Sequence, residues 1–276
     1  MSISSALAAR LTIPVIGSPL FIISGPEMVI AQCKAGVIGS FPSLNARPIA
    51  QFEEWLQRLN TELGPQDAPY AVNLIVHKSN DRLMADLELC VKYKVPLIIT
   101  SLGAREDVNA AIHSYGGIVM HDIINDKFAR KAIEKGADGL VAVAAGAGGH
   151  AGTISPFALV QEIRQWFDGP VALSGSIATG AAVLAAEAMG ADFGYIGSAF
   201  IATAEARSVD GYKQMIVDNS TPDCDSGSRL RNELSNSCEP AVDNSAELCP
   251  PIQIAERNAL VEGRMPFPYE ARSFSV

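Results

Sequence analysis

Eight short apolar runs, separated by longer amphipathic segments, are the feature that most constrains how this 276-residue chain can fold. Runs of this kind that alternate with helical segments are typical of repeated strand–helix units, which build a parallel sheet. Eight units within about 200 residues are what a closed (β/α)8 TIM barrel requires, although a doubly wound open sheet would show the same periodicity. The predicted strands are residues 14–18, 36–41, 70–76, 96–101, 117–121, 139–144, 170–174 and 193–197.

Glycines at the ends of the predicted helices support this organisation. The triplets Gly136-Ala137-Asp138 and Gly190-Ala191-Asp192 each stand directly before a predicted strand, as expected of short loops that follow a helix. Helices are predicted over residues 80–93, 156–167 and 177–189. We therefore predict an α/β fold, a TIM barrel formed by residues 1–218.

The last 58 residues have a different composition. They contain three of the five cysteines and six of the 16 prolines, but only two of the 23 glycines, and they show no sustained strand or helix period. We predict that residues 219–276 form an irregular C-terminal extension that the barrel does not need for closure.

Charge and composition exclude several classes of function. A net charge of −9 and the lack of any Lys/Arg run argue against binding to nucleic acid. The longest uncharged segment, residues 139–161, contains five glycines and a proline, so no membrane span is predicted. Five cysteines without a C-x-x-C pair argue against a disulfide framework or a zinc site and favour a cytoplasmic location. The sequence does not indicate an oligomeric state.

In a parallel barrel, functional groups lie where the strands end, and the segment after the sixth strand is the most informative. Its sequence is Gly146-Ala147-Gly148-Gly149-His150-Ala151-Gly152. A dinucleotide fingerprint is a weak match, because no helix opens at once. A loop with so few side chains would let a flat ligand lie against its backbone beside one imidazole; a flexible loop with an incidental histidine is the alternative.

Two further turns predict an anion site. Ser174-Gly175-Ser176-Ile177 and Gly197-Ser198-Ala199-Phe200 follow the seventh and eighth strands, and each is expected to enter a helix at once. Backbone N–H groups at two adjacent helix N-termini would bind phosphate. Separately, Asn73 is a polar residue within an apolar strand, and its amide must find a partner in the barrel or on a ligand.

These motifs resemble the nitronate monooxygenase family, whose members are FMN-containing TIM barrels. The similarity covers about residues 12–217. It includes the first-strand Ser18-Pro19-Leu20, the strand around Asn73, both Gly-Ala-Asp joints, the glycine-histidine loop, and the segments from Ser174 to Gly180 and from Gly197 to Phe200.

The resemblance implies a role for each matching residue. His150 would be the catalytic residue that orients an anionic nitronate or removes a carbon-bound proton from a nitroalkane, with O₂ as the oxidant. His121 lies near the position of a lysine that is common in the family, and a protonated imidazole would replace its charge. FMN would be bound by Ser18, Pro19, Leu20, Asn73, His121 and Gly148 around the ring and ribityl chain, and by Gly175, Ser176, Gly197 and Ser198 at the phosphate.

The chain also departs from the family pattern, and this leaves other functions open. Ser176 stands where a second glycine is usual, Val143 stands where glutamine is frequent, and the lysine near His121 is missing. One alternative is a related FMN- and NAD(P)H-dependent enoyl-acyl-carrier-protein reductase. Others are a flavin-free barrel isomerase or synthase acting on a sugar phosphate, and a catalytically silent flavin-binding protein.

Overall fold

The computed structural model describes residues 7–149 and 151–218 and contains one eight-stranded parallel sheet. Neighbouring strands pair in the order β1-β8-β7-β6-β5-β4-β3-β2. A parallel bridge between Ile16 and Ile38 joins the two ends of this order, so the sheet closes into a barrel. The strands are β1 (Val15–Gly17), β2 (Ser40–Pro42), β3 (Ala71–Ile75), β4 (Leu97–Ser101), β5 (Ile118–Ile123), β6 (Gly139–Val143), β7 (Val171–Ser174) and β8 (Phe193–Ile196).

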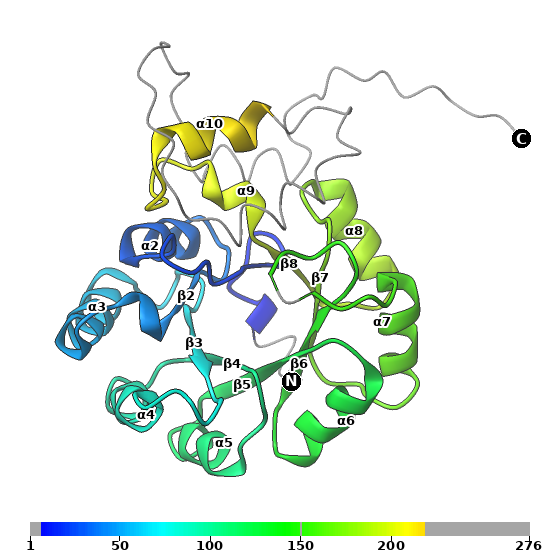
Figure 1. The fold of residues 1–276 in the computed structure, drawn as a ribbon, viewed down its shortest axis with the longest axis horizontal. Coiled ribbons are helices and arrows are strands. Elements are labelled where there is room, and N and C mark those ends of the chain that lie inside the picture. The colour runs from blue at the N-terminus through cyan, green and yellow to red at the C-terminus, as the bar shows by residue number, and fades with distance from the viewer. Residues whose placement is uncertain (1–6, 150, 219–276) are drawn as a thin grey trace, which may run out of the picture.

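Helices surround the barrel on its outside (Figure 1). They follow the strands along the chain, as repeated strand–helix units require. They are α2 (Pro26–Lys34), the 3-10 helix η1 (Ser43–Asn45), α3 (Ile49–Glu62), α4 (Leu83–Lys92), α5 (Glu106–His113), α6 (Asp126–Glu134), α7 (Pro156–Arg164), α8 (Gly180–Ala188), α9 (Ser198–Ile201) and α10 (Asp210–Asp218).

The predicted TIM barrel is confirmed, and each predicted strand run contains or overlaps an observed strand. Closure excludes the doubly wound alternative. Two helices begin later than predicted: α4 begins at Leu83 and not near Asn80, and α8 begins at Gly180 and not at Ile177. The Thr179 side chain caps α8 by accepting a hydrogen bond from the Ala182 backbone N–H, 3.2 Å away. A side-chain cap of this kind marks where a helix can start.

The strands place alternate residues on two hydrophobic layers, because successive side chains of a strand point to opposite faces. Inward-facing residues fill the barrel, and outward-facing ones pack beneath the helices. The interior is therefore a packed core and not a channel. Its buried members are Leu7, Ile16, Ile38, Ala71, Leu97, Ile99, Met120, Val141, Ala172, Phe193 and Tyr195.

The C-terminal extension that we predict for residues 219–276 lies outside the described residues. Within the part of the chain that the structure describes, no helix is both long enough and apolar enough to cross a bilayer. Of the cysteines in that part, Cys33 and Cys90 are both free and buried.

Candidate active site

The turns after β7 and β8 lie side by side at the carboxyl end of the barrel. Their strands pair directly, with Ser174 opposite Tyr195. The turn after β7 passes through Gly175 (φ +143°) and Ser176 (φ +54°), and such left-handed backbone cannot belong to a helix. The prediction that both turns enter helices at once is therefore wrong for β7, and only Gly197 leads directly into a helix, the four-residue α9. Phosphate binding here would depend on the backbone N–H groups of two turns.

The loop between β6 and α7 packs tightly on the turn after β7. The Ser176 backbone N–H donates to the Gly146 carbonyl over 3.1 Å. A Cβ added at Gly175 would lie 2.8 Å from the Ala145 carbonyl oxygen, closer than real Cβ contacts come. Two independent features therefore require glycine at position 175: its positive φ and the close approach of the Ala145 carbonyl.

Glycines of the same loop fall into two groups. Gly152 is in close contact, because an added Cβ would lie 2.6 Å from the Val143 carbonyl oxygen. Gly148 and Gly149, in contrast, have no atom of the described residues within 4 Å of an added Cβ. Packing against the described residues therefore does not explain these two glycines, although the φ of +69° at Gly149 itself favours glycine. Both present bare backbone on this side of the loop. His150 follows them directly but lies outside the described residues.

The loop between β1 and α2 approaches the turn after β8. The Ser18 backbone N–H donates to the Ile196 carbonyl over 2.8 Å, and an added Cβ at Gly197 would lie 2.6 Å from the Ser18 Oγ. Asn45 fixes the rest of this loop: its Nδ2 donates to the Leu20 and Ser24 carbonyls, both at 2.9 Å. Ser18, Pro19 and Leu20 are thus held near the end of β8.

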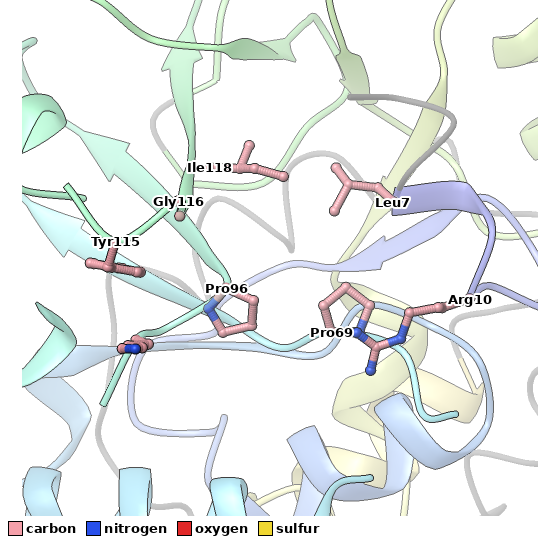
Figure 2. Close-up of a pocket in the computed structure, with 9 residues that line it drawn as sticks. Leu7, Arg10, Pro69, Pro96, Tyr115, Gly116 and Ile118 are labelled. Carbon is pink, nitrogen blue, oxygen red and sulfur yellow. The ribbon is translucent and has the colours of Figure 1, made fainter. Parts of the chain in front are cut away.

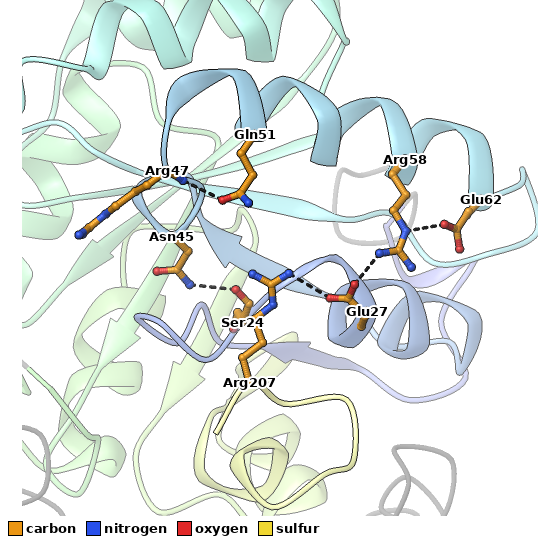
Figure 3. A network of polar contacts seen from close by, with 8 residues as sticks. All are labelled: Ser24, Glu27, Asn45, Arg47, Gln51, Arg58, Glu62 and Arg207. Carbon is orange, nitrogen blue, oxygen red and sulfur yellow. Dashed lines mark hydrogen bonds and ion pairs between the residues drawn. The ribbon is translucent and has the colours of Figure 1, made fainter. Parts of the chain in front are cut away.

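Charged side chains behind this loop connect it to the outer helices (Figure 3). The Glu27 carboxylate of α2 accepts from Arg58 of α3 at 2.5 Å and from Arg207, which follows α9, at 3.3 Å. Burial opposes ionisation of Glu27, but hydrogen bonds from its own backbone and from Arg58 still lower its pKa. The Arg207 guanidinium also lies 4.5 Å from the Trp55 ring centre. The segment after α9 is thereby joined to α2 and α3.

A chain of polar side chains lies inside the barrel. Asn73 Nδ2 donates to the Ile99 carbonyl at 2.9 Å and to Ser101 Oγ at 2.7 Å, and Ser101 Oγ donates to Asp122 Oδ2 at 2.5 Å. Both amide protons of Asn73 are used, so this side chain can only accept a hydrogen bond from a ligand. Asn73 was predicted from the sequence, whereas Ser101 and Asp122 were not, although Asp122 is equally a polar residue at the end of an apolar run.

His121 does not lie on the inner wall, so its predicted role beside the flavin is wrong in this structure. Its ring hydrogen-bonds to Thr100 Oγ1 at 2.6 Å, and both residues belong to the outward-facing sides of their strands. Burial lowers the pKa of His121 to about 4. The ring is therefore neutral near pH 7 and cannot replace the charge of a lysine.

A cavity of about 300 Å³ lies at the other end of the barrel (Figure 2). It is lined by Pro69, Pro96 and Ile118, which lie at or just before the starts of β3, β4 and β5, together with Leu7 and Arg10. In TIM barrels the active site is at the carboxyl end of the strands, so this cavity is not the candidate site. Among the described residues, no group of three or more His, Cys, Asp or Glu side chains could hold a metal ion.

Comparisons with known proteins identify a family for this chain. The nitronate monooxygenase family model matches residues 45–228. The chain is 26% identical over 200 residues to a hydroxy-methyl-oxo-octahydroindene-carboxyl-CoA dehydrogenase from Rhodococcus jostii, covering 72% of this chain and 55% of that protein. It is 25% identical over 252 residues to a nitronate monooxygenase from Paraburkholderia phytofirmans, covering 74% of this chain and 67% of that protein.

Solved structures show the same fold. FabK from Thermotoga maritima aligns with a TM-score of 0.69 and 25% identity, covering 77% of this chain and 66% of that one. A nitroalkane oxidase from Streptomyces ansochromogenes aligns with a TM-score of 0.69 and 23% identity, covering 75% and 71%. The chain spans about half the length of the carboxyl-CoA dehydrogenases that it matches. Because the family model covers most of the chain, this protein belongs to the nitronate monooxygenase family.

Proposed function

We propose that this protein binds FMN at the carboxyl end of its barrel and oxidises alkyl nitronates, with O₂ as the electron acceptor. Family membership supports flavin-dependent oxidation of nitro compounds. The structural observation that carries the proposal is the loop surface at Gly148 and Gly149, where bare backbone faces open space next to the turn after β7. A flat ring can lie against such a surface, because no side chain holds it away.

The described residues fit the two ends of the cofactor. Backbone N–H groups of the turns after β7 and β8 would bind the phosphate, since amides of this kind favour an anion. The Ser176 N–H already donates to the Gly146 carbonyl, so Ser176 would contribute its hydroxyl instead. The open loop, the fixed β1–α2 loop and the free oxygen of Asn73 would hold the ring and ribityl chain. Bound FMN would supply the oxidation chemistry. The proposed contacts are Ser18, Pro19, Leu20, Asn73 and Gly148 for the ring and ribityl chain, and Gly175, Ser176, Gly197 and Ser198 for the phosphate.

His150 is proposed as the catalytic residue on the strength of the family resemblance. An imidazole with an ordinary pKa of about 6.5 can hold an anionic nitronate when protonated, or accept a proton from a neutral nitroalkane when unprotonated. Replacing His150 with Asn should preserve FMN binding and sharply reduce turnover of neutral nitroalkanes. Undiminished nitroalkane turnover in this variant would remove His150 from the role of base.

The proposal is tested by the spectrum and by oxygen consumption. Purified protein should be yellow and should release FMN when it is denatured. Adding an alkyl nitronate should then consume O₂ without NAD(P)H. A colourless protein that takes up no added FMN would eliminate the flavin proposal and favour a phosphate-binding isomerase or synthase. Flavin binding without turnover of any substrate would identify a silent flavin-binding protein.

A second candidate is redox chemistry on an acyl thioester. It is favoured by the match to two proteins named as carboxyl-CoA dehydrogenases, and by the fold shared with FabK and with the enoyl reductase domain of MlnA. Oxidation of NAD(P)H by an enoyl thioester, with no oxygen consumption from nitronate, would decide for this candidate. The opposite result would decide for nitronate.

A further inference from the structure

Asp122 is a carboxyl group inside the barrel that the proposed function does not use. On β5, Met120 belongs to the barrel interior, whereas Val119 and Ile123 belong to the outer layers beneath the helices. Asp122 follows Met120 by two residues, so its side chain points inward. It lies one residue before the carboxyl end of β5, the end at which the proposed flavin site is built.

Hydrogen bonding determines which oxygen of Asp122 can meet a ligand. Ser101 Oγ accepts from Asn73 Nδ2, so its own proton is directed to Asp122 Oδ2. Oδ2 of the ionised carboxylate is therefore occupied as an acceptor, which leaves Oδ1 as the oxygen that can accept from a ligand. The Oδ1 atom is shielded from solvent but accepts no hydrogen bond from the described residues. An unpaired carboxylate oxygen in such a place is costly unless something donates to it.

The groups that could titrate around Asp122 are few. Burial raises the pKa of Asp122 to about 6, although the Ser101 hydrogen bond opposes this. On β8, Tyr195 belongs to the same interior, and burial together with the Asp122 charge keeps its pKa well above 10. His121 points to the opposite face and is neutral above about pH 4. Of the described interior groups, Asp122 is thus the one that changes charge near pH 6.

We propose that Asp122 Oδ1 accepts a hydrogen bond from an N–H of the bound flavin ring, next to the free oxygen of Asn73. This inference depends on the proposed flavin site. Asp122 Oδ1 accepts no hydrogen bond from the described residues, Asn73 Oδ1 is the acceptor of an amide whose N–H groups both donate elsewhere, and Ser101 links the two side chains. The oxidised flavin ring has a single N–H, so only one of these oxygens can accept it, and the edge of the ring that carries this N–H would face Asp122 at the carboxyl end of the barrel.

The pH dependence of FMN binding tests the proposal. A donor on Oδ1 favours the ionised carboxylate, so binding must expel a proton wherever Asp122 is protonated in the free protein. Wild-type Kd should therefore fall as pH rises from 5 to 6, by up to about tenfold per pH unit, and level off above the pKa. Kd is measured between pH 5 and 8 by quenching of FMN fluorescence.

Three variants separate Asp122 from other titrating groups. In D122N, the decrease in Kd that the wild type shows between pH 5 and 6 should be absent. In H150N it should persist, because the imidazole is not its source. In S101A the loss of the hydroxyl raises the pKa of Asp122 further, so Kd should level off at a higher pH. The FMN phosphate also titrates near pH 6, and riboflavin, which lacks it, serves as the second probe.

The outcomes are distinguishable. Identical pH profiles for wild type and D122N would overturn the inference while leaving the flavin site intact. Failure of the wild type to bind any flavin would overturn the proposed function itself. Thermal unfolding of each variant reports whether it is folded; if D122N is not, the S101A profile decides, and an unshifted profile there counts against the inference.

Discussion

Replacing Gly148 with Ala separates ligand binding from folding at this site. Gly148 has no positive φ, and an added Cβ would meet no atom of residues 7–149 and 151–218 within 4 Å, so this part of the chain accommodates the methyl group without strain. The unfolded chain loses conformational freedom, and G148A should gain about 0.4–1 kcal/mol in unfolding free energy. For a barrel of this size, that gain corresponds to a rise of about 1–4 °C in the Tm of the flavin-free protein.

The same methyl group should weaken flavin binding. If the ring lies against the loop backbone, the methyl occupies its contact surface, and a mismatch of about 1–3 kcal/mol is typical of one added group. This raises the Kd for FMN by about 5- to 150-fold. Fluorescence quenching measures the Kd, and differential scanning calorimetry of the flavin-free protein measures the Tm.

Gly211 provides a matched control, because it also has open space at its Cβ position and lies in α10. G211A should gain a similar stability and bind FMN as the wild type does. An unchanged FMN Kd in G148A would refute the placement of the ring against the loop. A lower Tm for G148A than for the wild type would show that packing does constrain position 148.

Three further predictions concern stability, measured by urea unfolding of the flavin-free protein. Burial raises the pKa of Asp122 to about 6 and lowers the pKa of His121 to about 4. As pH rises from 4 to 6, the unfolded chain ionises Asp122 before the folded chain does, which lowers the unfolding free energy. Over the same range the unfolded chain still holds a proton on His121 that the folded chain has lost, which raises the unfolding free energy. Between pH 4 and 6 the unfolding free energy of D122N should therefore increase by about 2 kcal/mol more than that of the wild type, whereas parallel pH curves would contradict the assigned pKa of Asp122. G175A should lose about 2–4 kcal/mol of unfolding free energy, because position 175 combines a φ of +143° with a close contact to the loop after β6. G116A should lose only about 1–2 kcal/mol, because position 116 has a φ of +85° but no described atom near an added Cβ. Equal losses in the two variants would argue against the contact at Gly175. E27Q should lose less than about 1 kcal/mol, because its ion pairs are exposed, and a larger loss would show that they hold α2 in place.

The sequence alone was sufficient for the repeated architecture. Strand runs, Gly-Ala-Asp joints and helix starts are local signals, since they depend on periodicity and on backbone preferences of single residues. The glycine-histidine loop and Asn73 were found in the same way. The predicted start of α8 was wrong because Thr179 has extended backbone and caps the helix, so residues 177–179 lie before it.

Only the tertiary structure decided which side chains share a space. Closure of the barrel depends on the bridge between Ile16 and Ile38, which joins distant ends of the sheet and leaves no trace in local periodicity. His121 and Asp122 are adjacent in sequence, yet one packs outside the barrel and the other inside, because strand side chains alternate and a shift of one residue exchanges the faces. Of the two, only His121 was predicted from the sequence as a site residue, and the register of β5 turns the carboxyl of Asp122, and not the imidazole, toward the barrel interior.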